Sequence, residues 1–299
     1  SRSLSLVKLA ASCLFRVCRH VLTTALSWPM YQHAVDERAR RTGNAVSTIA
    51  VRDGILNCGW ATRDVAECLA GAFVQEKCDG LFLPAVDHLG IRLPIREIVQ
   101  RIEREREIRF CVIDAAQAFC HVPIAESLEF ADFVVAGSHK WMRAYLPTGI
   151  GLFGHRRSAA VIRGRLQQVL QSARLDDPLL QFTEQLEGGQ LDGYSETANL
   201  ASLFACAGAA NDAAEVAGLT TMQPISPDID ELRRSIPPVR GEWEPLLPSE
   251  PMRSRIVLFE SQDADMQRSP ADVLRRTWLD AGCIVSAYGG GRVRVSVPP

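Results

Sequence analysis

The sequence has no Cys-x-x-Cys pair, no long uncharged apolar run and no strong excess of charge of either sign. Its 299 residues include 33 Lys and Arg against 35 Asp and Glu, for a net charge of -2. Without an overall basic field, we expect neither a nucleic acid nor a membrane as a partner. No uncharged apolar run approaches the roughly 18 residues of a transmembrane helix, so no membrane span is expected.

The nine cysteines are odd in number, and their spacing fits neither a disulfide framework nor a zinc site. In a chain of this length they indicate reduced, mostly buried thiols, which are typical of a cytoplasmic protein. We therefore predict a cytoplasmic location and no bound metal.

What the sequence does contain is an alternation of short apolar runs with helical periods. Hydrophobic residues make up 47% of the chain, enough for a substantial core. Strands are predicted at 20–24, 46–51, 81–86, 110–114, 133–136 and 149–153, with helices at 4–17, 31–42 and 94–102 among others. Such alternation predicts an α/β fold with a mainly parallel sheet.

Proline marks a change in organisation near residue 220. Seven of the sixteen prolines lie between residues 221 and 251, which favours a linker or irregular crossing over regular structure. We expect a large domain at 1–218, a linker at 219–252 and a small α+β domain at 253–299.

Three polar features follow or occupy predicted strands. Asp114 ends one strand with Gln117 three residues later, Lys140 follows another, and Arg294 lies on a strand near the C-terminus. Taken singly, they are ordinary: Asp114 could cap a helix, Lys140 could be a solvated surface lysine, and Arg294 could be the polar face of a strand. Together they match the needs of pyridoxal phosphate, which uses a lysine amine, a carboxylate on its ring nitrogen and an arginine for a substrate carboxylate.

The segment 112–153 resembles the core of the class V aminotransferase family, which includes cysteine desulfurases, isopenicillin-epimerase-like proteins and C–S lyases. The motifs that carry the resemblance are Asp114-Ala115-Ala116-Gln117, Ser138-His139-Lys140-Trp141 and Pro147-Thr148-Gly149-Ile150-Gly151. The resemblance implies the fold-type-I transferase fold of enzymes that depend on pyridoxal 5'-phosphate, with a large cofactor-binding domain and a small C-terminal domain.

The resemblance also implies a role for each matching residue. Lys140 is expected to form the Schiff base, Asp114 to hold the pyridine nitrogen and Arg294 to bind the substrate carboxylate. The other expected cofactor contacts are Gln117 at the ring oxygen, Ser138 and His139 near the phosphate, Asp87 near the cofactor and Trp28 against the ring.

The expected activity is that of a class V aminotransferase-like enzyme acting on an amino acid or related amine through an external aldimine and an α-carbanion. A C–S lyase or epimerase of the same family is an alternative, and so is a non-catalytic binding or regulatory protein on the same fold. The family's active sites lie at a dimer interface, which implies a homodimer. A cysteine desulfurase needs an exposed cysteine in the loop shortly before the substrate arginine. Cys283 is instead expected on the apolar strand that precedes this loop, which argues against persulfide chemistry.

The family's N-terminal arm and phosphate-cupping turn would precede Ser1, unless Ser1 to Ser5 are a remnant of that turn. The chain also stops abruptly after Pro298 and Pro299. We expect a piece of a longer protein, and the missing turn is the reason to consider the non-catalytic alternative.

Overall fold

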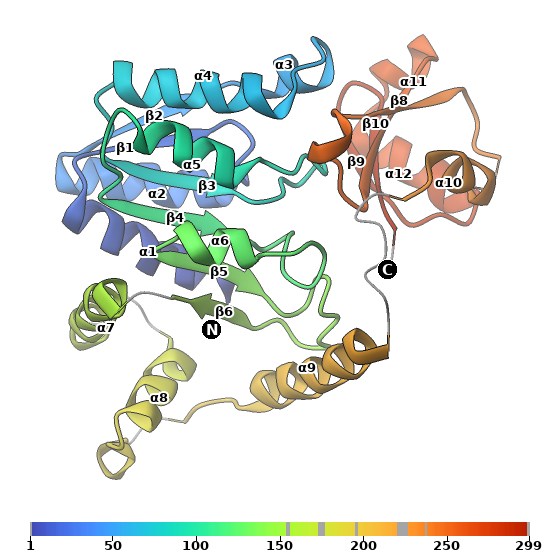
Figure 1. Cartoon of the computed structure of the whole chain (residues 1–299). Coiled ribbons are helices and arrows are strands. Elements are labelled where there is room, and N and C mark those ends of the chain that lie inside the picture. The colour runs from blue at the N-terminus through green and yellow to red at the C-terminus, as the bar shows by residue number, and fades with distance from the viewer. Residues whose placement is uncertain are drawn as a thin grey trace.

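The computed structural model describes residues 2–153, 156–172, 177–194, 197–219, 227–236 and 238–297. Figure 1 shows a mainly parallel sheet between layers of helices, with a second, smaller unit beside the strand ends. No helix of the described ranges is long and apolar enough to span a membrane.

The large sheet has the order β2-β1-β3-β4-β5-β6. All neighbouring strands are parallel except β6, which pairs antiparallel with β5 at the edge. The strands are β1 (His20–Thr24), β2 (Ala45–Ile49), β3 (Gly80–Pro84), β4 (Phe110–Asp114), β5 (Phe133–Gly137) and β6 (Gly149–Leu152).

Successive residues of the central strands enter two different hydrophobic cores. In β4, Cys111 and Ile113 face one core while Phe110 and Val112 face the other. This follows from the two-residue period of a strand, and a parallel sheet covered on both faces needs apolar residues at every position. The predicted strands are almost continuously apolar because both faces of the sheet are covered.

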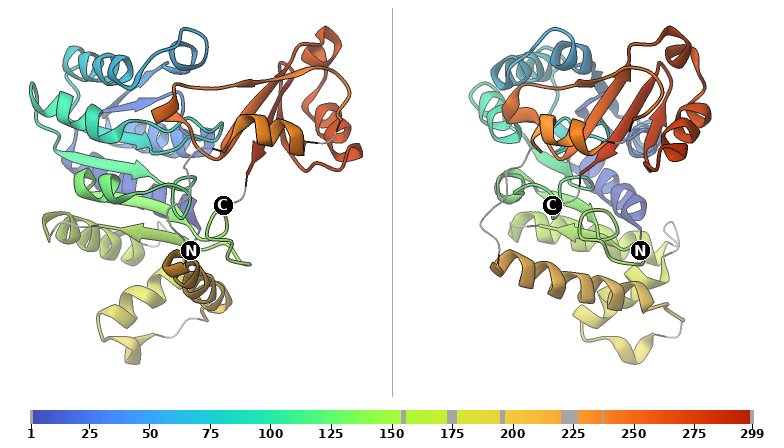
Figure 2. Two further views of the ribbon diagram at one scale, coloured as in Figure 1. Left: turned by 45° about the vertical axis from the view of Figure 1, so that its right-hand side comes forward. Right: turned by 90° about the vertical axis from the view of Figure 1, so that its right-hand side faces the viewer.

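Helices cover both faces of the sheet. One core contains residues of α3 (Arg52–Leu56), α4 (Thr62–Gln75), α5 (Ile95–Glu103) and α6 (Ala125–Phe130), and the other contains residues of α1 (Ser3–Val17), α2 (Pro29–Thr42) and α7 (Arg156–Gln171). Gly43 ends α2 in the left-handed conformation with φ of 68°, which glycine adopts without steric cost. The helices α7, α8 (Pro178–Glu187) and α9 (Ala201–Leu219) extend on the side of edge strand β6 (Figure 2).

The second unit is built on a four-stranded antiparallel sheet of order β7-β8-β10-β9 within the described residues. Its strands are β7 (Trp243–Leu246), β8 (Ile256–Ser261), β9 (Ser286–Tyr288) and β10 (Arg292–Ser296), and its helices are α10 (Ile229–Ser235), α11 (Ala264–Arg268) and α12 (Ala271–Asp280). Its core is centred on Trp278, Phe259 and Leu274.

This unit begins earlier than residue 253, the boundary expected from proline content. Strand β7 pairs with β8, and Leu232 of α10 is buried in the unit's core. The described residues 227–236 and 238–252 are therefore structured parts of the second unit, although they hold five of the prolines counted above. Prolines fit here because β7 is an edge strand, where Pro245 need not donate a ladder hydrogen bond. The expected linker residues 220–226 and residue 237 lie outside the described residues.

Hydrogen bonds hold the second unit against the loop at the carboxyl end of β3. The amide of Arg92 donates to the carbonyl of Met252 at 2.8 Å, and the Ser254 hydroxyl donates to the carbonyl of Gly90 at 2.8 Å. Gly90 has φ of +102°, and a Cβ there would lie 2.1 Å from the carbonyl oxygen of Ile256. Only glycine permits this close approach, which fixes the second unit beside the strand ends.

Candidate functional site

A cavity of about 340 Å³ lies where the second unit meets the carboxyl ends of the large sheet. Loops after the neighbouring strands β1, β3, β4 and β5 contribute side chains, and β10 contributes one from the second unit. Ligands bind at this edge of open parallel sheets. The residues lining the cavity include seven of the predicted site residues, namely Trp28, Asp87, Asp114, Gln117, His139, Lys140 and Arg294.

Asp114 is the last residue of β4, and its side chain is buried. Its Oδ1 accepts a hydrogen bond from the amide of Ala116 at 2.9 Å. Among the described residues no donor to its Oδ2 is found. Burial raises the pKa of Asp114 to about 6, against the opposing effects of the Ala116 amide and of positively charged Lys140. The site thus presents one uncommitted carboxylate oxygen, which a cationic ring nitrogen can neutralise.

Lys140 is half-buried in the loop after β5 and lines the same cavity. Burial lowers its pKa, an effect that Asp114 opposes and Arg294 reinforces. A lowered pKa raises the fraction of neutral amine, the form that attacks carbonyl groups. Neighbouring His139 is more exposed, and burial followed by the charge of Lys140 lowers its pKa.

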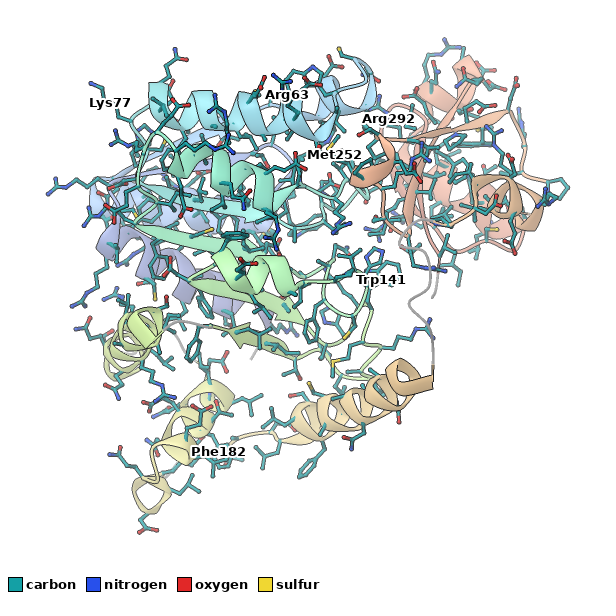
Figure 3. All side chains as sticks on the ribbon, in the orientation of Figure 1. Arg63, Lys77, Trp141, Phe182, Met252 and Arg292 are labelled. Carbon is teal, nitrogen blue, oxygen red and sulfur yellow. The ribbon has the colours of Figure 1, made fainter. Side chains whose placement is uncertain are left out.

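Gln117 is held by an aromatic pair beside Lys140. Its Oε1 accepts a hydrogen bond from Trp141 Nε1 at 3.2 Å, which leaves its amide nitrogen as the donor group. The Trp141 ring stacks on His121 with ring centroids 3.7 Å apart. The hydrogen bond between Gln117 and Trp141 joins the loop after Asp114 to the loop that carries Lys140. Trp141 is labelled in Figure 3, at the strand ends.

Asp87 follows β3 and organises its own loop. Its Oδ1 accepts hydrogen bonds from the amides of Leu89 and Ile91, at 2.9 and 2.8 Å. Its Oδ2 lies 3.8 Å from Arg52 and has no hydrogen-bond partner among the described residues. Burial raises the pKa of Asp87 to about 6, while the Ile91 amide and Arg52 oppose the shift. Asp87 therefore shapes the cavity wall in addition to facing the cavity.

His88 is a cavity residue that the sequence did not single out. Its ring lies edge-on to Trp28, with centroids 5.2 Å apart, and 5.9 Å from the ring of Tyr288 in the second unit. Burial lowers its pKa to about 4, helped by the charges of Arg52 and Arg294. Its position directly after Asp87 was the one hint in the sequence that His88 belongs to the site. Its aromatic neighbours Trp28 and Tyr288 come from distant segments, so their contact with it could not be predicted.

Arg294 is the contribution of β10 to the cavity. One terminal nitrogen donates to the carbonyl of His88 at 3.0 Å and the other donates to the Ser286 hydroxyl at 3.0 Å. Its Nε is buried without a partner among the described residues. This guanidinium is therefore oriented by both units and keeps a donor unused.

Ser138 is the one predicted site residue that does not line the cavity. It is fully buried, its Oγ accepts from the Thr148 amide at 3.0 Å, and the hydroxyl donates to the Leu146 carbonyl at 3.4 Å. These bonds close the turn between β5 and β6. The geometry thus gives Ser138 a structural task, and a phosphate contact stays a prediction without support from its position.

The N-terminal end of α1 reaches the same cavity. Ser3 lines it, and the Tyr31 hydroxyl, also in the lining, donates to Ser3 Oγ at 2.6 Å. The amino end of a helix carries a partial positive charge and unpaired amides, which suit an anion.

Known proteins resemble this chain in part of its sequence and in the whole of its fold. Residues 60–178 match the sequence profile of the family described as aminotransferase class-V. The profile match covers less than half of the chain, and within it the chain is similar to the class V aminotransferases. The family resemblance predicted from the sequence is thereby confirmed, and the match spans both Asp114 and Lys140.

Solved structures of two aminotransferases and of a further PLP-containing protein share the fold. Ureidoglycine–glyoxylate aminotransferase from Bacillus subtilis has a TM-score of 0.68 at 15% identity, covering 99% of this chain and 72% of its own. Alanine–glyoxylate aminotransferase from Nostoc sp. has a TM-score of 0.68 at 14% identity, covering 98% of this chain and 73% of its own. A C-DES mutant with glycine covalently linked to its PLP cofactor has a TM-score of 0.65 at 16% identity, covering 98% of this chain and 74% of its own.

These likenesses show that the chain has the fold of the fold-type-I transferases, as the sequence predicted. A search of curated protein sequences finds no match.

Proposed function

We propose that this chain binds pyridoxal 5'-phosphate in the cavity through Lys140 and acts as an aminotransferase on an amino acid or a related amine with a carboxylate. The observation that carries the proposal is that Asp114, Lys140 and Arg294 line one cavity although they come from three separate parts of the chain. The class V match and the fold shared with aminotransferases support it.

The residues present fit the cofactor. Asp114 offers an uncommitted buried oxygen for a protonated ring nitrogen, and Gln117 keeps its amide donor for the ring oxygen. The α1 end with Ser3 offers amides and positive potential for a phosphate. Trp28, 43% exposed, can cover one face of the ring. When bound, pyridoxal phosphate supplies an electron sink for a carbanion at the substrate α-carbon.

Each protein group then has a defined task. Buried Asp114, ionised beside a cationic ring nitrogen, keeps that nitrogen protonated. Arg294 orients the substrate by binding its carboxylate with guanidinium donors. The Lys140 amine would take the α-proton of the substrate, and its lowered pKa leaves more of the amine in the basic form.

Absorbance spectroscopy tests the proposal. Titration of the protein with pyridoxal phosphate should give the visible band of a lysine-bound cofactor, which borohydride abolishes. The Lys140→Ala variant should lack the band, whereas Lys8→Ala, which removes an exposed lysine on α1, should keep it. A folded parent protein without the band would refute cofactor binding through Lys140.

Product analysis separates the reaction types. An aminotransferase needs a keto-acid acceptor and yields a new amino acid, whereas a C–S lyase releases sulfide or thiol and an epimerase only inverts the α-carbon. All three exchange the α-proton with solvent, so exchange without a net product would favour epimerisation. A partner complex that persists in Lys140→Ala, in protein that lacks the cofactor band, would favour the binding-protein alternative.

The homodimer and the cytoplasmic location also stay proposals. Sedimentation at micromolar concentration should give twice the 32.9 kDa chain mass if the family's dimeric arrangement applies here.

A further inference from the structure

His121 connects three segments around the cavity without lining it. Its Nδ1 lies 2.7 Å from the carbonyl oxygen of Gln117, and its Nε2 lies 2.8 Å from the backbone nitrogen of Arg255 in the second unit. Its ring stacks on Trp141, with an interplanar angle of 21°. One side chain thus contacts the Gln117 loop, the Lys140 loop and the start of the second unit's sheet.

The two hydrogen bonds determine which nitrogen carries the proton. A carbonyl oxygen can only accept, so Nδ1 must donate to Gln117, and a backbone amide can only donate, so Nε2 must accept from Arg255. The neutral ring satisfies both requirements. Burial lowers the pKa of His121 to about 4; the Gln117 carbonyl opposes the shift, while the charges of Arg255 and Arg92 reinforce it.

Arg255 is hydrogen-bonded to Val297, which directly follows the strand that bears Arg294. Its side-chain Nε donates to the carbonyl of Val297 at 3.2 Å, and its own carbonyl accepts from the Val297 amide at 2.8 Å. Val297 directly follows β10, whose Arg294 pairs in register with Leu258 of β8. The path from the Gln117 loop to Arg294 therefore runs through the His121 ring, the backbone hydrogen bond between Arg255 and Val297, and the chain of β10.

We propose that His121 is a positioning residue that fixes the distance between Arg294 of the second unit and the Lys140–Gln117 side of the cavity. Its contribution to substrate binding rests on the proposed function, while the connection itself does not. Loss of the connection leaves the groups expected to hold the cofactor in place and lets the second unit shift. Binding of the substrate carboxylate then weakens more than binding of the cofactor.

Three substitutions separate the contacts of the ring. His121→Gln places an acceptor near the Nε2 position, so it can keep the bond to Arg255. His121→Asn places a donor near the Nδ1 position, so it keeps only the bond to Gln117. His121→Phe keeps the stacking on Trp141 and loses both bonds. His33→Gln, at an exposed position of α2, is the matched control.

The first readout is hydrogen exchange of the Arg255 amide, followed by NMR in protein labelled with ¹⁵N-arginine. We expect exchange to quicken by about tenfold or more in His121→Asn and His121→Phe, and by much less in His121→Gln, because a lost hydrogen bond opens the amide. Equal exchange in all variants and the parent would overturn the proposal whether or not the protein binds a cofactor.

The second readout is kinetic. In His121→Asn and His121→Phe the KM for the amino acid should rise by about tenfold while the cofactor dissociation constant changes by less than about threefold. Restoration of KM in His121→Gln supports positioning, and an equal loss of cofactor affinity in all three variants contradicts it. If the parent lacks the cofactor band, the proposed function fails and the exchange result alone decides the connection. If His121→Phe does not fold, His121→Gln and His121→Asn still give the comparison.

Discussion

Replacing Asp114 with asparagine should make the cofactor-free protein more stable at neutral pH. A carboxyl whose pKa rises from 3.8 to about 6 on burial is costly to ionise in the folded state. The folded protein then binds more protons than the unfolded chain between these two values, so stability falls as pH rises through this window. The cost is about 3 kcal/mol above pH 6, at about 1.4 kcal/mol for each pH unit.

Asparagine keeps the oxygen that accepts from the Ala116 amide and carries no charge. Asp114→Asn should therefore match the parent near pH 4 and exceed it by up to about 3 kcal/mol at pH 8. Urea unfolding of both cofactor-free proteins at pH 4, 5, 6, 7 and 8 measures the difference. Glu107→Gln, which changes an exposed carboxylate, is the control and should show no such growing difference.

The same substitution should weaken pyridoxal phosphate binding, because the ring nitrogen loses its anionic partner. Stability and cofactor affinity then move in opposite directions, as expected for a charge kept for function rather than for folding. A variant no more stable than the parent at pH 8, or an advantage that does not grow with pH, would refute the reasoning from burial.

Three further substitutions test other parts of the account. Arg294→Gln should raise the KM for carboxylate substrates by about 10- to 100-fold and leave the cofactor band intact, as measured by steady-state kinetics and absorbance. Gly90→Ala should lower the free energy of unfolding in urea by about 2 kcal/mol or more, because φ is positive there and the new Cβ would strike the Ile256 carbonyl. Gly71→Ala, in open space on α4, should instead raise it by about 0.5–1 kcal/mol. Cys283→Ser should change turnover less than about twofold, because the partly buried thiol packs against the second unit's core; a large loss would instead indicate thiol chemistry.

The sequence predicted the large sheet well because its strands carry strong local signals. β1 and β4 begin and end at the predicted residues, since both their faces are buried and the apolar run itself marks the strand. Helix α4 was not predicted, although Val65, Leu69 and Phe73 recur at four-residue spacing on its buried face. The signal for this helix was thus present in the sequence.

The second unit was harder to predict because its pairing is not local. β7 contains Pro245 and is a strand only because β8 lies beside it. Strand β9 begins at Ser286, whereas the sequence placed Cys283 on this strand; Cys283 precedes β9, and Ile284 is 90% exposed.

Apart from Arg294, which lies on β10 of the second unit, the predicted site residues in the cavity end or follow parallel strands, and such strands end at one edge. The contacts of His88 and His121 could not be predicted in this way, since their partners Tyr288 and Arg255 come from the second unit. Roles that depend on contacts between the two units emerge only from the folded structure.

The most direct test of the central claim is to trap the cofactor and locate its attachment. The chain has three lysines, Lys8, Lys77 and Lys140. Borohydride reduction of the protein with pyridoxal phosphate, followed by peptide mass spectrometry, should place the added mass on Lys140 at one equivalent per chain. Modification spread over the exposed Lys8 and Lys77, with Lys140 unmodified in folded protein, would contradict the account.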